Sequence, residues 1–588
     1  MSFRQLIQMQ FYIPYYQRDY TWEKKHVLAL MDDFKDAVHR AHTYPQKIAN
    51  HYLSNFVLMS RKDNQNHTDL IDGQQRLTTI IMLLKAIALA LQNTPKSSSV
   101  INDIDGLLWP FSNNQNFILM SPNAANGNVA YLDNLLNGKQ PSAINATQRN
   151  IDSTFLYLKS LLSTDPVDLL ALYSCILNSD VTIHVVSDIV EANRIFITLN
   201  ARGKQLTYFE KIKGLLIYYA EKVGNQVLAS DIHADFERIS LAYEAIDNIR
   251  SAETPVIKLK ADGPIDIDTL LGWHYCTIKQ LEQIIPASTA YDEIEKNLKC
   301  LSIPLDWETF INQYRSSAVA FFENMHAVFD LINTDTKYYE TIVMCRLTSI
   351  VWPLIVACNY RGFLNSNINV SNQRAITLFR LIQIIDKIHR VTKTPGQELI
   401  QLAWVTFNDQ NKKDQDIADA IIEYHRSKWT RKSYSIPTKI VTEENDYFNY
   451  ILFDFAVPVG GRSTVKNLRD FRKSGMRAAQ VLRNYYGVLV RKDHNYNSND
   501  KFSEGISSIG NYVLLKNAFI DTVDGVETKQ GPMNPVELVN FAKSQRILLI
   551  ADTANLFNAV TTIQSVDQTT IDARTNAIAL YLQNEWEI

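Results

Sequence analysis

The chain has 588 residues, which is too many for one hydrophobic core and predicts roughly three to four domains. With 46% hydrophobic and 21% charged residues, its composition is that of an ordinary globular protein. The formal net charge of −3 excludes a protein that coats nucleic acid over its whole surface, so any DNA-binding surface is expected to be local.

The five cysteines lie far apart and none has CxxC spacing, which argues against a zinc knuckle and against a disulfide framework. A reducing compartment fits this pattern best. The most apolar run, Ile80–Leu91, is interrupted by Lys85 and is too short to span a bilayer, and the first residues contain no long apolar segment. We therefore expect a cytoplasmic protein with no membrane contact.

The N-terminal third alternates short strands and helices. Apolar runs bounded by polar, turn-prone residues predict strands at His51–Ser60, Thr68–Ile71 and Val181–Ser187. Leu77–Leu91 is apolar almost all round, which predicts a buried helix. The segment Asn93–Asn150 is rich in Asn, Ser, Pro and Gly, which indicates long loops or an insertion.

Helical patterns follow, first near Ile189–Leu199 and Thr207–Val223 and then through most of Ser230–Lys432. Beyond them, a loop-rich region around Val457–Thr464 precedes a basic helix, and the tail after Pro535 is again helical in pattern. We predict an α+β protein with three domains: a mixed N-terminal domain over residues 1–225, an all-helical domain over 226–435, and a small mixed domain over 436–588.

Three N-terminal blocks carry polar residues typical of a site: IPYYQRDYTW at 13–22, IDGQQRLTT at 71–79, and NRIFITLNARGKQLT at 193–207. In the second block a strand ends at Asp72-Gly73 and a buried helix begins at Leu77, so Gln74–Arg76 are expected at a helix N-terminus, where backbone N–H groups and the dipole favour a phosphate.

Each polar side chain near this turn suits nucleotide chemistry. Arg76 presents a fork of donors that matches phosphate oxygens, and Asp72 suits a magnesium ion or an oriented water. Gly73 allows close backbone approach, and Arg18, among aromatic residues, offers a second phosphate contact or an aromatic stacking surface. A purely structural alternative stays open, since a DG turn before a helix is common and an Arg–Asp pair can simply join two segments. The sequence contains no GxxxxGKS or GxxxxGKT loop, which argues against a P-loop ATPase.

Taken together, in this order and at this spacing, the three blocks resemble the N-terminal domain of GmrSD-type restriction proteins. The resemblance covers residues 1 to about 225 and implies a fold related to ParB and sulfiredoxin. It also implies that the DGQQR block serves a nucleoside triphosphatase that powers or gates DNA cleavage. Asp72 and Arg76 are the candidate catalytic pair, and the full candidate nucleotide site is Gln17, Arg18, Asp72, Gly73, Gln74, Gln75, Arg76, Asn200 and Arg202, the last two in a supporting role.

A second candidate chemistry lies near the C-terminus, where a predicted strand ends at Asp493-His494. An HNH nuclease needs a histidine as general base, an acid or Asn on the metal, and an Asn that holds the histidine loop. His494, Asp493 and Asn511 are the candidate catalytic residues, and Asp493 with Asn517 the candidate ligands of Mg²⁺ or Mn²⁺.

GmrSD proteins usually end in such a domain, and IGNYVLL at 509–515 resembles part of it. The usual proline after the histidine is missing here, where Asn495 to Asn497 follow His494. An accidental Asp-His turn and a degenerate, non-cutting domain therefore stay open as alternatives.

A basic stretch accompanies this segment. Residues 462–492 contain nine Lys and Arg against the single acid Asp470, which is the local charge that phosphate contact requires. The candidate DNA-binding residues are Arg469, Arg472, Lys473 and Arg477. A solvated helix face is the structural alternative.

The leading functional hypothesis is a nucleotide-dependent DNA endonuclease that restricts foreign, modified phage DNA, with a nucleoside triphosphate and Mg²⁺ or Mn²⁺ as cofactors and with possible homo-oligomers. One alternative is a nucleotide-switched DNA sensor whose C-terminal domain no longer cuts. Another is a DNA-binding nucleoside triphosphatase subunit that works with a separate nuclease. The sequence does not identify the nucleotide or the DNA modification.

Overall fold

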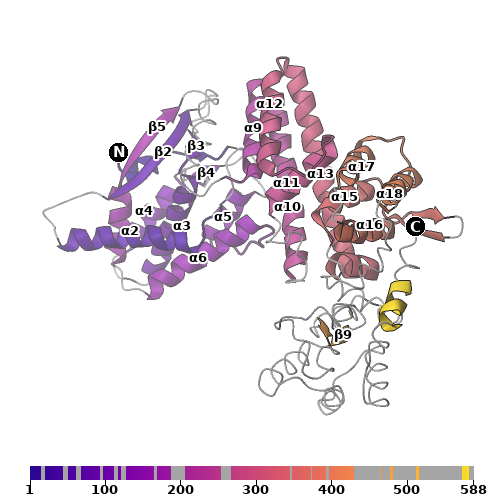
Figure 1. Ribbon diagram of the computed structural model, residues 1–588. Helices are drawn as coiled ribbons and strands as arrows, with labels where there is room; N and C mark the ends of the chain where they lie inside the picture. Colours follow the sequence, from indigo (N-terminus) through magenta and orange to yellow (C-terminus); the bar gives the residue numbers. More distant parts are fainter. Residues whose placement is uncertain are drawn as a thin grey trace, which may run out of the picture. The chain divides into compact units, whose positions relative to one another are not determined.

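The computed structural model of the chain divides it into two compact units (Figure 1). The first comprises Met1–Glu244 and Ala287–Val319, and the second comprises Ala245–Pro286 and Ala320–Ile588. The structure describes residues 1–14, 20–43, 51–60, 68–92, 94, 97–110, 117–120, 127–164, 168–186, 206–252, 266–344, 347–371, 374–392, 396–429, 464, 466, 477–480, 512–515 and 573–581.

The first unit is built on a mixed sheet with the strand order β4-β1-β3-β2-β5. Strand β2 pairs antiparallel with β3 and parallel with β5, and β1 pairs parallel with both β3 and β4. The strands predicted at 51–60, 68–71 and 181–187 are confirmed. Their bounds are β1 Phe11–Tyr12, β2 Tyr52–Ser60, β3 Thr68–Asp72, β4 Leu119–Met120 and β5 Asp180–Val186.

Helix α3, Gln74–Leu91, is the central core helix of this unit. Twelve of its residues are buried, and it packs against α4, α6 and α7, which confirms the prediction of a helix that is apolar all round. It is also long and apolar enough to cross a membrane, but 67% of it is buried inside the protein, as in a core helix. Figure 1 shows α3 with α2 (Lys24–Thr43), α4 (Ser98–Leu108) and α6 (Ala146–Thr164) on one side of β2 and β5.

Long loops or an insertion were predicted over 93–150, and the expectation of long loops is wrong for the described residues of this segment. It contains α4, strand β4, helix α5 (Asn128–Leu136) and the start of α6, and α7 (Leu169–Asn178) follows. The abundant Asn and Ser residues concealed an amphipathic spacing: Ile104, Leu107 and Leu108 of α4 are buried in the core. Polar residues on the outer faces of helices are compatible with helix as long as one apolar stripe is buried.

Four helices complete the first unit, two of which continue into the second. They are α9 (Tyr208–Lys222), α10 (Gln226–Ala252), α12 (Ala287–Cys300) and α13 (Pro304–Thr334). The predicted helix over 207–223 is confirmed as α9, and a capping box between Thr207 and Glu210 defines its start.

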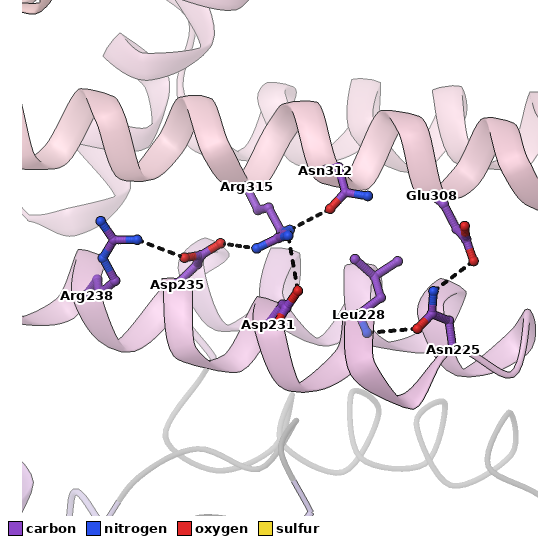
Figure 2. A network of polar contacts seen from close by, with 8 residues as sticks. All are labelled: Asn225, Leu228, Asp231, Asp235, Arg238, Glu308, Asn312 and Arg315. Carbon is purple, nitrogen blue, oxygen red and sulfur yellow. Dashed lines mark hydrogen bonds and ion pairs between the residues drawn. The ribbon is translucent and has the colours of Figure 1, made fainter.

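A polar network joins α10 to α13 (Figure 2). The Arg315 guanidinium donates to Asp235 at 2.5 Å and to Asp231 at 3.2 Å. The Asn225 amide, just before α10, donates to Glu308 of α13 at 2.9 Å. Arg315 and Asp235 are the least exposed ion pair of this network, at 19% and 11%, so removing either partner would leave a largely buried charge without its closest partner.

The second unit is mostly helical, with α11 (Ile267–Ile278), α15 (Trp352–Tyr360), α16 (Leu378–Thr392), α17 (Gln397–Asn408) and α18 (Asp414–Trp429). Short helical segments lie between α13 and α15: an α-helical turn α14 (Thr336–Tyr338), a π-helix η1 (Tyr339–Met344) and a 3-10 helix η2 (Ser349–Val351). At its centre, Trp352 stacks on Trp273 at 6.2 Å and on Phe329 at 5.4 Å between ring centroids.

The prediction that residues 226–435 are entirely helical is wrong at one place. Strands β6 (Asn367–Ser371) and β7 (Arg374–Thr377) form an antiparallel pair within the second unit. Ile368 and Val370 of β6 are buried and alternate with polar residues, which is the period-two pattern of a strand. Two strands of five and four residues are too short to stand out from the surrounding helical pattern.

In the C-terminal region, strand β8 (Arg477–Gln480) pairs antiparallel with β9 (Tyr512–Leu515). The prediction of a basic helix is therefore wrong at Arg477–Gln480, which forms a strand. This segment has no β-branched or aromatic residue that would indicate a strand, but it pairs with β9. Pairing across sequence-distant strands overrides local helical preference. Residues 573–581 are helical, as the pattern after Pro535 predicted for this part of the tail.

Candidate functional site

The strand–helix turn at Gly73 determines the geometry of the candidate site. Gly73 has φ of +100° and is the residue immediately before α3. A Cβ at this position would lie 2.4 Å from Cδ1 of Phe56 on the neighbouring strand β2. Both the left-handed backbone and the close ring therefore require glycine at this position.

The turn presents the first residues of α3 at an N-terminus without a side-chain cap. Gly73 has no side chain to accept from the first turn, and the first turn of α3 contains no acidic residue. The Leu77 N–H is bonded to the Gly73 carbonyl at 2.9 Å, so Gln74, Gln75 and Arg76 precede the first intrahelical bond of this type. Their backbone N–H groups and the positive end of the helix dipole favour an anion.

Arg76 places a cation beside this N-terminus. Its side chain is half-buried, and burial lowers its pKa, whereas the nearby charges of Asp72, Tyr52 and Asp33 raise it. An arginine stays protonated in proteins, so the result is a guanidinium that has lost part of its hydration. Such a group binds phosphate or carboxylate oxygens more strongly than a fully exposed one.

The structure brings the first sequence block to the second. The Thr21 N–H donates to Oε1 of Gln75 at 2.8 Å, and the Tyr20 hydroxyl bonds Oγ1 of Thr79 at 2.8 Å. Burial is the main cause of the raised Tyr20 pKa, in keeping with an exposed fraction of 3%. Blocks that lie more than fifty residues apart in sequence therefore meet along one face of α3.

Two residues that the sequence analysis did not name act electrostatically on Arg76: Asp33 of α2 and Tyr52, the first residue of β2. His51, immediately before β2, is in turn close enough to Asp33 to be influenced by its charge. Burial lowers the pKa of His51, with a smaller opposite contribution from Asp33 and a further lowering by Arg40. No local motif marks these positions, because their proximity to Arg76 arises from the fold.

Several candidate residues lie outside the described residues, so their predicted roles stay predictions. In the N-terminal domain these are Gln17, Arg18, Asn200 and Arg202, together with the helix expected near 189–199. In the C-terminal region they are Asp493, His494, Asn511, Asn517, Arg469, Arg472 and Lys473. Of the predicted DNA-binding residues, Arg477 has a described backbone, in β8, and β8 and β9 flank the segment that carries Asp493 and His494.

Within the described ranges, no group of three or more His, Cys, Asp or Glu side chains is arranged to hold a metal ion. The turn instead offers single carboxylates, Asp72 and Asp33, near a cation and a helix N-terminus. This donor set fits a metal ion that is bound together with phosphate oxygens, because Mg²⁺ usually takes one or two protein carboxylates and keeps substrate oxygens.

The fold and the turn define a mixed α+β domain whose strand–helix junction favours anions. Residues 3–217 match the family model of the GmrSD restriction endonuclease N-terminal domain. Residues 3–217 thus form an N-terminal domain of the GmrSD restriction type, and this domain points to a restriction-related nuclease system. A comparison with curated proteins returns no match.

Proposed function

We propose that this chain is a nucleotide-dependent DNA endonuclease that acts in the cytoplasm and restricts foreign, modified phage DNA. The observation that carries the proposal is the Asp72–Arg76 turn, in which a half-buried arginine lies beside an uncapped helix N-terminus. The family match over residues 3–217 adds the restriction context.

Each described residue of the turn has a role in this proposal. The backbone of Gln74–Arg76 and the Arg76 guanidinium bind the phosphates of a nucleoside triphosphate. Asp72 orients the attacking water or holds Mg²⁺ or Mn²⁺, and Asp33 is a second carboxylate whose charge acts on Arg76. Gln17 and Arg18, and Asn200 and Arg202 in support, complete the site.

The proposed cleavage of DNA belongs to the C-terminal region. His494 is the proposed general base, since an imidazole with a pKa near its usual ~6.5 accepts a proton from water at neutral pH. Asp493 and Asn517 are the proposed metal ligands and Asn511 fixes the histidine loop. Arg469, Arg472, Lys473 and Arg477 are the proposed phosphate contacts.

The test is nicking of phage and plasmid DNA by the purified protein, with Mg²⁺ or Mn²⁺ and with or without each nucleoside triphosphate. We expect cleavage that requires both metal and nucleotide, and its loss in His494→Ala with nucleotide hydrolysis retained. Hydrolysis without cleavage of any DNA would support the sensor or the subunit with a separate nuclease. Cleavage that is independent of nucleotide would overturn the proposal.

A further inference from the structure

Two hydrogen bonds hold the end of the first block against α3. The Thr21 N–H donates to Gln75 Oε1 at 2.8 Å, in the first turn of the helix. One turn further along, the Tyr20 hydroxyl bonds Thr79 Oγ1 at 2.8 Å, and that Thr79 hydroxyl donates to the Gln75 carbonyl at 2.8 Å. Consecutive residues of one segment are therefore attached to two consecutive turns of one helix.

These contacts give the Gln75 side chain a role different from the phosphate binding proposed for Arg76. Its side-chain oxygen is occupied by a backbone N–H of the protein itself, whereas the resemblance placed this residue among the nucleotide ligands. Tyr20, whose hydroxyl makes the parallel contact, is only 3% exposed and presents almost no surface to a ligand. Both bonds nevertheless constrain the same two residues, Tyr20 and Thr21.

We propose that Gln75 is a positioning residue, which fixes residues 20–21 on the first turn of α3 and thereby aligns the turn for nucleotide hydrolysis. The proposal rests on the proposed nucleotide function of the same turn. Tyr20 and Thr79 form the second half of this attachment. An attachment of this kind acts on the geometry of the catalytic step rather than on the strength of substrate binding.

The role of positioning predicts a specific pattern in hydrolysis kinetics. Gln75→Met keeps the size of the side chain but removes the acceptor for Thr21, and Tyr20→Phe removes the second bond from the other side. Both variants are expected to lower kcat about tenfold, which is about 1.4 kcal/mol and within the range of one buried hydrogen bond, while KM changes less than about twofold. The double variant is expected to lose less than the product of the two single losses, because the two bonds hold one segment.

A nucleotide-free measurement separates this proposal from the proposed function. Hydrogen exchange of the Thr21 amide is expected to be slow in the wild type, faster in Gln75→Met, and slow again in Gln75→Glu, since a carboxylate also accepts the Thr21 N–H. If Gln75→Met leaves this exchange unchanged, the attachment is wrong whether or not the protein hydrolyses nucleotides.

Kinetics supply the other outcomes. If Gln75→Met raises KM more than tenfold while Tyr20→Phe has wild-type kinetics, Gln75 is a direct nucleotide ligand and the positioning role is overturned. If the wild type hydrolyses no nucleotide but the Thr21 amide shows the expected exchange rates, the attachment is correct. The proposed nucleotide function and the role of Gln75 in hydrolysis are then both wrong.

Discussion

In the first unit the described polar side chains with a proposed function, those of Asp72 and Arg76, lie at a strand–helix junction, half-buried and close to a helix N-terminus. In the second unit two histidines are buried in the core: His274 is 0% exposed and His425 is 5% exposed. Burial is the chief cause of their lowered pKa values, to about 3 for His274 and about 4 for His425.

A strong pKa shift therefore does not by itself mark a functional site. The ring of His274 packs against that of Phe321 at 5.7 Å between centroids, on the interior of the helical unit. A histidine in this environment stays neutral and acts as a core residue. Arg76, by contrast, is only partly desolvated and keeps its charge next to the first turn of α3, where a ligand can reach it.

The largest expected effect comes from the turn itself. Gly73→Ala introduces a Cβ at 2.4 Å from Phe56 on a backbone with φ of +100°. We expect a loss of about 4 kcal/mol in the free energy of unfolding, from backbone strain and overpacking together. Urea unfolding followed by circular dichroism measures this loss.

Gly138→Ala is the matched control for that variant. Its φ is +78°, yet nothing lies within 4 Å of an added Cβ. Backbone strain alone then costs about 1–2 kcal/mol. Equal losses for the two variants would show that the contact with Phe56 is not restrictive, and the double variant Gly73→Ala, Phe56→Leu should recover part of the loss.

The polar network between α10 and α13 gives an intermediate effect. Arg315→Met leaves Asp235, which is 11% exposed, without its closest partner at 2.5 Å. We expect a loss of about 2–3 kcal/mol in the free energy of unfolding. Arg238, which is 53% exposed, contacts the same carboxylate at 3.2 Å, and Arg238→Met is expected to cost below about 1 kcal/mol. The prediction fails if the two variants unfold at the same urea concentration.

The buried histidines give an effect that is small near neutral pH and grows as the pH falls. The unfolded chain binds a proton on each histidine below pH ~6.5, whereas folded His274 binds one only near its pKa of about 3. Stability is therefore lost as the pH falls from 6.5 towards 3, by up to about 1.4 kcal/mol per pH unit for this residue. His274→Asn should reduce this slope in unfolding experiments between pH 6 and pH 4.

His425→Asn is the comparison for this prediction. The folded pKa of His425 is about 4, so its contribution stops growing at a higher pH than that of His274. The two substitutions together should reduce the slope more than either alone. A slope that neither variant changes would mean that other groups control the acid sensitivity of the chain.

Much of the first unit follows from local patterns in the sequence. A strand at 68–71, a glycine turn and a buried helix over 77–91 were predicted because each has a strong local signal: an apolar run, a DG pair and a helix that is apolar almost all round. The structure has them at 68–72, Gly73 and 74–91. The Asp72–Arg76 turn was therefore placed correctly. The helices within 93–150 were missed because their polar outer residues dominate the composition of that segment.

The contacts around the turn were beyond the reach of local patterns. Thr21 and Gln75 are 54 residues apart, and Asp33 reaches the surroundings of Arg76 from another helix. Such proximity depends on how α2 and α3 pack on the sheet, which no single segment encodes. The hairpin β6–β7 was missed for the opposite reason, since its signal is local but only a few residues long.

Nucleotide hydrolysis by Arg76→Ala tests the central claim most directly. Arg4→Ala is the matched control, because Arg4 lies in the same unit and contacts Asp103 at 2.6 Å on helix α4, with 40% of its side chain exposed. We predict that Arg76→Ala abolishes hydrolysis while its circular dichroism spectrum matches that of the wild type, and that Arg4→Ala hydrolyses normally. Wild-type hydrolysis by a folded Arg76→Ala protein would contradict the account.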